Sequence, residues 1–270
     1  MDVFSADWPG ICRRIVVGQR AIFDEVRGVE ARTVYEGVGE GGDRTLVIDR
    51  RCEDMVFAEL EALAAQGASF VAVSEERGEV SFGDGGAARV VIDPIDGSLN
   101  ARRTLPPHSL SIAVASGSSM ADVEFGYVFD FGAGEEFVAR RGEGAKLGGE
   151  PIEVGPDGKM LELLGVESAE PERALRSLEA LVGRVYRLRV VGSIAITAAY
   201  VAAARFDAML SLRPCRSVDA AAAQLIVREA GGVVAFGDLA PSDALLDLDA
   251  RYPIAAAAGE QGLSIARSAQ

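Results

Sequence analysis

The sequence predicts a chain whose first half is α+β and whose second half is α/β. Its 270 residues, 49% of them apolar, can bury a large core as one big domain or as two fused subdomains. Short apolar runs joined by short turns dominate the first half, whereas strand-like and helix-like segments alternate in the second, as in a sheet covered by helices. We expect a boundary near Gly149, with an N-terminal subdomain at residues 1–149 and a C-terminal subdomain at residues 150–270.

Two amphipathic segments open the chain. Residues 8–28 carry apolar side chains at helical spacing and end at Gly28, so we predict a helix there. A glycine-rich loop at residues 36–44 separates it from a second expected helix at residues 49–65. The apolar runs that follow predict strands at residues 70–73, 89–92, 109–115, 123–129 and 136–139, the last three joined by turns short enough for antiparallel pairing.

The second half changes to alternating elements. The same periodicity predicts strands at residues 161–166, 185–190, 208–210, 233–236 and 253–257. Between them it predicts helices at residues 171–182, 193–204 and 219–230.

The composition limits the cellular compartments and the binding partners that we expect for this protein. Three scattered cysteines and an N-terminus without a basic-then-apolar segment predict a reduced, cytoplasmic protein. No apolar run reaches the length of about 18 residues that a membrane span needs. The formal net charge of −14 argues against nucleic-acid and anionic-membrane partners. An anionic substrate would also be repelled, unless bound divalent cations reverse the local field.

The strongest local motif begins where the apolar run of residues 90–92 meets Asp93 and Asp96. Because Pro94 and Gly97 exclude a helix, we expect both carboxylates on a turn at the end of a strand. The Ile95 carbonyl is available as a third oxygen ligand, and an all-oxygen site favours Mg²⁺ over Zn²⁺. A second interpretation is an ordinary Asp-Gly turn.

Other carboxylates follow predicted strands or open predicted helices. Glu75 and Glu76 follow the apolar run at residues 70–73, where they form either part of a cation site or a solvated loop. Asp219 opens an alanine-rich helix, where it is either an N-cap or a group facing a ligand cleft. Asp43 and Asp49 flank the glycine-rich loop, and Asp49 is also a candidate N-cap.

Five motifs resemble those of the inositol monophosphatase family, the lithium-sensitive, metal-dependent sugar phosphatases. Along the chain they occur in the same order as in the family. The family signature Asp-Pro-Ile-Asp-Gly-Thr-x-Asn resembles residues 93–100, with Ser98 in place of Thr. The family's second signature, Trp-Asp-x-Ala-Ala-Gly followed by Glu-Ala-Gly-Gly, resembles residues 218–223 and 229–232. The family's Glu-Glu pair, early aspartates and Gly-Ser segment correspond to Glu75 and Glu76, to Asp43 and Asp49, and to Gly192 and Ser193.

This resemblance implies a five-layered αβαβα sandwich, a homodimer, and two or three Mg²⁺ ions at a site where both halves meet. The implied metal ligands are Glu75, Asp93, Asp96, Asp219 and the carbonyl of Ile95. Ser98 with Glu75 would orient and deprotonate the attacking water, and Asp49 is counted with them as catalytic. The implied substrate contacts are Asp96, Gly97, Ser98, Gly192, Ser193 and Asp219.

Several positions depart from the family pattern. Ser98 keeps the hydroxyl of the family threonine but loses its methyl group. Val218 replaces a tryptophan, Ala223 a glycine, and Ala101 a common aromatic residue. The segment that contains Arg213 and Arg216 resembles prokaryotic dual-specificity members that also cleave fructose 1,6-bisphosphate. These arginines either meet a second phosphate or pair with carboxylates at the surface.

The implied activity is Mg²⁺-dependent hydrolysis of a small sugar or polyol phosphate, with myo-inositol 1-phosphate as the first candidate. Fructose-1,6-bisphosphatase activity, alone or in addition, is an alternative. Hydrolysis of 3′-phosphoadenosine 5′-phosphate or NADP would require an aromatic surface for base stacking. Only 6% of the residues are aromatic, and the sequence indicates no such surface. A non-catalytic binding relative is the alternative of a different class, and retention of the acidic residues argues against it.

Overall fold

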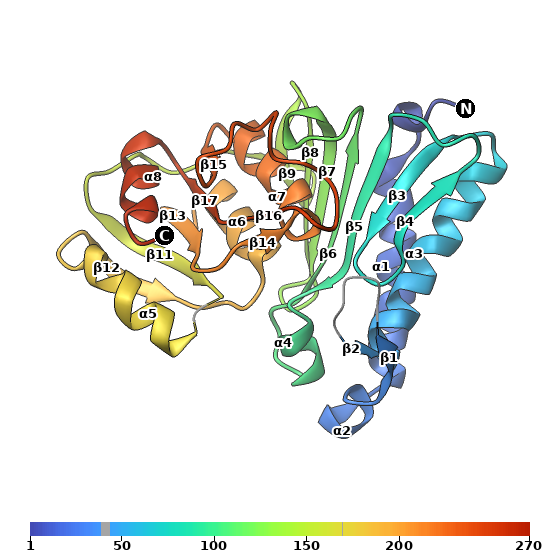
Figure 1. Ribbon diagram of the computed structural model, residues 1–270, viewed down its shortest axis with the longest axis horizontal. Helices are drawn as coiled ribbons and strands as arrows, with labels where there is room; N and C mark the ends of the chain where they lie inside the picture. Colours follow the sequence, from blue (N-terminus) through green and yellow to red (C-terminus); the bar gives the residue numbers. More distant parts are fainter. Residues whose placement is uncertain (39–43, 169) are drawn as a thin grey trace.

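The computed structural model describes residues 1–38, 44–168 and 170–270, and its helices and sheets form five layers (Figure 1). The outer layer holds α1 (Trp8–Glu25) and α3 (Val47–Ala65), which cover one face of an eight-stranded sheet. α6 (Ile194–Ala202) and α7 (Ser217–Glu229) lie between this sheet and a five-stranded one. The helices α5 (Pro171–Ser177) and α8 (Glu260–Arg267) pack on the other face of the five-stranded sheet, away from α6 and α7. The expected αβαβα sandwich is confirmed.

The large sheet consists of β3 (Phe70–Ser74), β4 (Gly78–Phe82), β5 (Arg89–Asp96), β6 (Ser109–Ala115), β7 (Val123–Asp130), β8 (Glu135–Arg140), β9 (Gly144–Leu147) and β10 (Glu150–Ile152). Its order is β10-β9-β8-β7-β6-β5-β3-β4. The neighbours β3 and β5 are parallel, and all other pairs are antiparallel. The C-terminal ends of β3 and β5 therefore meet at the same edge, which brings together the acidic residues that end these strands.

The smaller sheet consists of β11 (Leu161–Glu167), β12 (Val185–Arg189), β13 (Ala208–Ser211), β15 (Val233–Phe236) and β17 (Ile254–Ala257), in the order β12-β11-β13-β17-β15. The first three strands are parallel. The remaining short elements are η1 (Val3–Ser5), α2 (Gly28–Arg32), β1 (Tyr35–Val38), β2 (Arg44–Leu46), α4 (Ser98–Arg102), η2 (Met120–Asp122), η3 (Leu178–Leu181), β14 (Cys215–Arg216) and β16 (Arg251–Tyr252).

Helix α7 lies very close to the large sheet because its buried side is made of alanines. Gly126 of β7 faces Ala222, and a Cβ atom at position 126 would stand 2.6 Å from the Ala222 carbonyl oxygen. At the C-terminal end of α7, the Glu229 carboxylate accepts hydrogen bonds of 3.0 Å from the amides of Gly142 and Gly144. Glu229 thereby ties the β8–β9 hairpin to α7.

Three expectations are corrected by the backbone. Strand β5 continues through Asp96 instead of giving way to a turn after Ile92, because a bulge between Asp93 and Asp96 accommodates Pro94, which cannot donate a ladder hydrogen bond. The first helix ends at Glu25, and a separate helix α2 begins at Gly28, whose φ is +82°. The predicted helix at residues 171–182 also divides, into α5 and η3.

The division of the chain near Gly149 stays a prediction. β10 follows that position and pairs with β9, so the large sheet extends to Ile152. Among the helices of the described residues, none combines the length and the apolar character needed to cross a membrane.

Candidate metal centre

Three carboxylates from three elements converge at the edge where β3 and β5 end. Glu75 directly follows β3, Asp93 lies in β5, and Asp219 lies in the first turn of α7. One carboxylate oxygen from each residue lies within 4.8 Å of the other two. A separation of this size allows one cation to contact all three groups, and the donors are oxygens, as hard divalent cations prefer.

The electrostatics of this cluster are unfavourable without a counter-charge. Burial raises the pKa of Asp93 well above its usual range, and the nearby carboxylates of Asp96, Glu75 and Asp219 raise it further. Burial also raises the pKa of Asp219 to about 8, helped by Asp96 and Glu75. Bound cations would reverse these shifts because they favour the ionised carboxylates. The residues present therefore fit a divalent metal.

A cavity of about 130 Å³ opens beside the cluster. It is lined by residues of three neighbouring segments: Asp49, Glu75, Glu76, Asp93, Pro94, Ile95 and Ser98. Burial raises the pKa of Asp49 to about 7, and the charge of Glu76 raises it as well. The buried Oδ1 atom of Asp49 has no hydrogen-bond partner among the described residues. An unsatisfied buried oxygen that lines a cavity indicates a missing ligand or water.

The sequence allows Asp49 and Asp219 to be N-caps, and the structure shows that neither is one. Each stands at the third position of its helix, where its carboxylate accepts the amide hydrogen bond of the capping residue. Leu46 donates to Asp49 at 3.4 Å, and Arg216 donates to Asp219 at 3.0 Å. This position faces an acid toward the helix N-terminus, whose dipole stabilises negative charge. Asp43, the other early aspartate, lies outside the described residues.

The segment after Asp93 is shaped by the approach of the two halves. The Ile95 amide donates to Asp93 Oδ1 at 3.0 Å, which fixes the orientation of that carboxylate. Gly97 precedes α4 with a φ of +87°, and a Cβ atom there would stand 2.9 Å from the carbonyl oxygen of Gly192. Only glycine fits both restrictions. Ser98 begins α4 and is exposed at the cavity.

Asp96 binds the N-terminus of α6 and lies outside the three-carboxylate group. Its carboxylate accepts hydrogen bonds from Ser193 Oγ at 2.5 Å, from the Ala195 amide at 2.7 Å and from the Ile194 amide at 3.3 Å. Burial raises its pKa, and these hydrogen bonds oppose that effect. The metal and substrate roles of Asp96 and the substrate roles of Gly192 and Ser193 stay predictions.

The two arginines of the C-terminal segment both pair with acids. Arg216 forms an ion pair with Glu75, so it lies at the acidic cluster. Arg213 pairs with Glu170 at 2.7 Å, and both of these side chains are half exposed. The structure thus places Arg216, and not Arg213, beside the candidate metal ligands.

Glu167 is a buried acid that was not singled out from the sequence. It ends β11 and accepts hydrogen bonds from the amides of Val191 and Gly192 at 3.1 and 2.9 Å, and from Thr197 Oγ1 at 2.7 Å. Burial raises its pKa to about 7. Glu167 positions the loop that leads to Ser193. Its place directly after the predicted strand at residues 161–166 was the signal, the same one that pointed to Glu75.

A second missed acid, Glu53, lies behind the cluster. It is buried on α3, accepts a hydrogen bond from the hydroxyl of Ser74 and pairs with Arg77. Burial raises the pKa of Glu53. Because Ser74 precedes Glu75, this contact anchors the end of β3 from which Glu75 projects. Nothing in the periodicity of α3 distinguishes Glu53 from a surface acid.

Known proteins resemble this chain over nearly its full length. The sequence model of the inositol monophosphatase family matches residues 17–270. A fructose-1,6-bisphosphatase/inositol-1-monophosphatase of Methanothermobacter thermautotrophicus is 32% identical over 260 residues, which cover 93% of this chain and 91% of that protein. An inositol-1-monophosphatase of Mesorhizobium japonicum is 32% identical over 199 residues, or 72% of each chain.

A solved structure agrees with the fold. The crystal structure of an inositol monophosphatase–fructose 1,6-bisphosphatase superposes with a TM-score of 0.84 at 26% identity. The superposition covers 98% of this chain and 100% of the other. The layers described above are therefore those of a known fold.

Proposed function

The chain belongs to the inositol monophosphatase family, whose members are phosphatases, and we propose that it is a Mg²⁺-dependent phosphomonoesterase acting on myo-inositol 1-phosphate. The observation that carries the proposal is the convergence of Glu75, Asp93 and Asp219 within 4.8 Å. Relatives that are named for inositol-1-phosphate hydrolysis support the choice of substrate.

In this proposal, Glu75, Asp93, Asp219 and the Ile95 carbonyl hold two or three Mg²⁺ ions, with Asp96 as a further ligand. Oxygen donors and the raised pKa of Asp93 support a hard cation. Bound Mg²⁺ supplies electrostatic stabilisation of the charge on the phosphoryl and leaving oxygens.

The residues of the chain position the reactants. Ser98 and Glu75 line one cavity with Asp49, and we assign them the orientation of the attacking water. The water oxygen forms a bond to phosphorus and its proton passes to Glu75, while the ester oxygen leaves with its electron pair and takes a proton from solvent. The amides of Gly97 and Ser98 donate to phosphate oxygens, and Gly192, Ser193, Asp96, Arg216 and Asp219 contact the substrate. Arg213, which pairs with Glu170 away from the acidic cluster, is left out of this set.

A second candidate is supported by the surroundings of the acidic cavity. A neighbouring hollow of about 240 Å³ is lined by Tyr35, Leu46, Asp49, Ser98, Leu99 and Arg102. The Arg102 guanidinium donates to the Tyr35 hydroxyl at 2.9 Å. An aromatic ring and a cation beside the site suit a nucleotide base and its phosphate, which keeps 3′-phosphoadenosine 5′-phosphate and NADP as alternative substrates.

A substrate panel tests the function. We expect Mg²⁺-dependent phosphate release from myo-inositol 1-phosphate to exceed that from fructose 1,6-bisphosphate, 3′-phosphoadenosine 5′-phosphate and NADP. Faster release from a nucleotide would transfer the assignment to the second candidate. Faster release from the bisphosphate would make the protein a fructose-1,6-bisphosphatase first. No release from any of them would support a non-catalytic relative.

Asp93→Asn tests the metal site. Losing one anionic ligand removes several kcal/mol of charge stabilisation, so we expect phosphate release to fall by about 100-fold or more. Calorimetry should show weaker Mg²⁺ binding as well. The matched control is Asp84→Asn, an exposed acid after β4, which should retain both properties. Parental activity in Asp93→Asn would contradict the assignment.

We also infer a homodimer formed through the β12 edge of the smaller sheet. Large apolar side chains are exposed on and near this edge strand: Met160 (67%), Leu175 (82%), Val182 (79%), Tyr186 (62%) and Val190 (64%). An uncovered apolar edge strand is an aggregation risk that a second copy removes. Arg187 and Arg189 of β12 and Glu172 of α5 supply both signs of charge near this face, which suits pairing across a two-fold axis.

Light scattering after size exclusion tests this inference. We expect a dimer for the parent and a monomer for the pair Tyr186→Glu and Leu188→Glu. The control is Leu239→Glu, a comparably exposed leucine distant in sequence from β12. A monomeric parent, or a dimer that survives the double substitution, would contradict the inference.

As a cellular location we infer the cytoplasm, because Cys12, Cys52 and Cys215 are all buried free thiols.

A further inference from the structure

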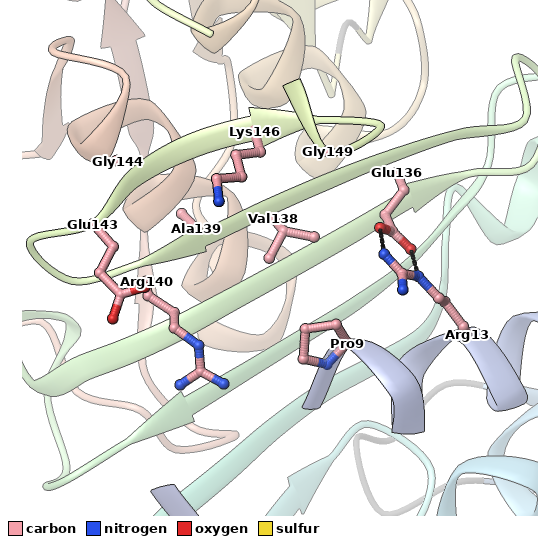
Figure 2. A pocket seen from close by; sticks show the side chains of 10 residues that line it. All are labelled: Pro9, Arg13, Glu136, Val138, Ala139, Arg140, Glu143, Gly144, Lys146 and Gly149. Carbon is pink, nitrogen blue, oxygen red and sulfur yellow. Dashed lines mark hydrogen bonds and ion pairs between the residues drawn. The ribbon is translucent and has the colours of Figure 1, made fainter. Parts of the chain in front are cut away.

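A cavity of about 250 Å³ lies on the outer face of the large sheet, where β8 and β9 extend beyond the cover of α1 (Figure 2). We call it the hairpin groove. It is lined by Pro9, Arg13, Glu136, Val138, Ala139, Arg140, Glu143, Gly144, Lys146 and Gly149. None of these residues lines the acidic cavity, so the two sites are separate.

Strand register places the polar side chains of the groove on one face. Val138 pairs with Lys146, and Arg140 pairs with Gly144. Because side chains two residues apart share a face, Arg140 and Lys146 are diagonal neighbours, whose Cβ atoms are typically about 7–8 Å apart. Gly144 and Gly149 add no side chains, which keeps the space above the strands open. The groove is therefore a concave site lined by two long cationic side chains on one face of the sheet.

Two charged residues of the groove, Arg13 and Glu136, compensate each other at one end. Arg13 donates two hydrogen bonds to Glu136, at 2.9 and 2.7 Å, and the Tyr127 hydroxyl donates to the same carboxylate at 3.1 Å. Figure 2 shows this pair at the end of the groove opposite Glu143. Arg13 and Glu136 thus neutralise each other and close that end.

Arg140 and Lys146 have no such compensation. Within the described part of the chain, neither forms an ion pair with a carboxylate, including Glu143, which lines the same groove. The Arg140 guanidinium instead lies over the Phe125 ring at 5.1 Å, which restricts its position. The chain has a net charge of −14, so two cations without acid partners in one concavity run against its composition.

We propose that the hairpin groove binds a small phosphate-bearing anion, with Arg140 and Lys146 as its cationic contacts. A guanidinium fork matches two phosphate oxygens, and an ammonium group supplies a mobile third donor. Val138 offers an apolar floor for the organic part of a phosphate ester. The cavity approaches the lower end of the volumes that hold small ligands, about 300 Å³.

Binding of inorganic phosphate, measured by calorimetry at constant ionic strength, tests the proposal in two arms. In the presence of Mg²⁺ we expect two phosphate sites, the acidic cavity and the groove. In the presence of a chelator we expect one site, the groove, because the metal-free acidic cavity repels anions. Binding in the second arm does not depend on the proposed phosphatase activity, so failure of one proposal is distinguishable from failure of the other.

The variants are Arg140→Gln and Lys146→Gln, which keep the length of the side chains on a partly exposed surface. Each should weaken phosphate binding in the chelator arm by about tenfold or more, the effect of losing one charge-assisted contact. The controls are Lys159→Gln, the other lysine of the chain, and Arg173→Gln, both exposed, which should bind as the parent does.

Two outcomes would overturn the proposal. One is a parent protein that binds no phosphate in the chelator arm. The other is phosphate binding that Arg140→Gln and Lys146→Gln leave unchanged, which would mean that the anion binds elsewhere. Retained Mg²⁺-dependent binding in both variants shows that they are folded, so a loss confined to the chelator arm supports the groove.

Discussion

Arg216 gives the acidic cluster a positive partner before any metal binds. Its side chain is 15% exposed and forms an ion pair with Glu75. A metal that uses Glu75 has to displace this guanidinium or share the carboxylate with it. Like charges in a partly buried site repel strongly because the surroundings screen them poorly. We therefore expect Arg216 to lower the affinity for Mg²⁺ and to attract an anionic substrate.

Arg216→Ala separates these two effects. We expect Mg²⁺ to bind several-fold more tightly by calorimetry, because a repulsive charge of about 1 kcal/mol or more is removed. The KM for the phosphate ester should rise, because an anion contact is lost. Arg213→Ala, whose partner Glu170 lies outside the cluster, is the matched control and should change Mg²⁺ binding little. Weaker Mg²⁺ binding in Arg216→Ala would show instead that the arginine organises Glu75.

At the residue scale, the sequence predicted which acids matter better than it predicted their contacts. Glu75 and Asp93 were recognisable because each ends an apolar run, and parallel strands bring such ends together. The partners of Asp96 were not, because Ser193 and Ala195 are nearly a hundred residues away. Long-range hydrogen bonds of this kind leave no periodic signal in the chain. The catalytic and ligand roles of these residues stay predictions.

At the element scale, the position of Asp219 depends on how closely α7 lies against β7. Small residues on both sides set that distance: the alanines of α7 and Gly126 of the strand. Gly126 faces the backbone of Ala222, not a flexible side chain that could move aside. The contact between β7 and α7 therefore leaves no room for even one added methyl group.

Gly126→Ala should therefore push α7 away from the sheet. The added Cβ would stand 2.6 Å from the Ala222 carbonyl oxygen, so we expect the free energy of unfolding to fall by about 1–3 kcal/mol, measured by urea titration. Mg²⁺ affinity should fall too, because Asp219 moves with the helix. In the control Gly155→Ala the new Cβ lies an ordinary 3.6 Å from Ala204. If Gly126→Ala is destabilised but binds Mg²⁺ as tightly as the parent, the Mg²⁺ affinity does not depend on the position of α7.

The elements that the sequence predicted are those with buried faces. Strands β6 and β15 have the predicted bounds, since continuous or alternating apolar residues mark a strand that packs on a helix. Strands β4, β9 and β10 were missed, because their exposed positions carry glutamate, lysine and glycine and no apolar run forms. Pairing with a neighbour, not local sequence, makes these segments strands.

At the scale of the whole molecule, the buried acids link metal binding to pH. The pKa values of Asp49 and Glu167 are raised to about 7 and that of Asp219 to about 8, in each case first by burial. The folded chain thus binds protons more tightly than the unfolded chain. The stability these groups contribute is present below the ordinary carboxyl pKa and is lost as the pH rises through about 7 to 8.

Magnesium should act in the opposite direction. It favours ionised carboxylates, so protons compete with it, and the rise in Tm caused by Mg²⁺ should grow between about pH 5.5 and about pH 8.5. Melting curves with Mg²⁺ and with a chelator measure this difference. In Asp219→Asn, which lacks the acid with a pKa of about 8, the dependence should flatten. A Mg²⁺ effect that is equal at all pH values would contradict the link between these acids and the metal.

The layered architecture was not deducible from periodicity alone. Alternating strands and helices predict a covered sheet, but they do not say that α6 and α7 would be shared by two sheets. That arrangement requires helices apolar on both sides, and α6 is buried almost throughout. The family resemblance, and not the pattern, implied the five layers.

Helix α7 connects the two sites. Asp219 in its first turn belongs to the acidic cluster, and Glu229 at its last residue holds the hairpin that carries Arg140 and Glu143. Its 13 residues span about 20 Å as one rigid rod. If an anion in the groove displaces that rod, it changes the affinity for Mg²⁺ by some factor. Thermodynamic reciprocity then requires Mg²⁺ to change the affinity for the anion by the same factor.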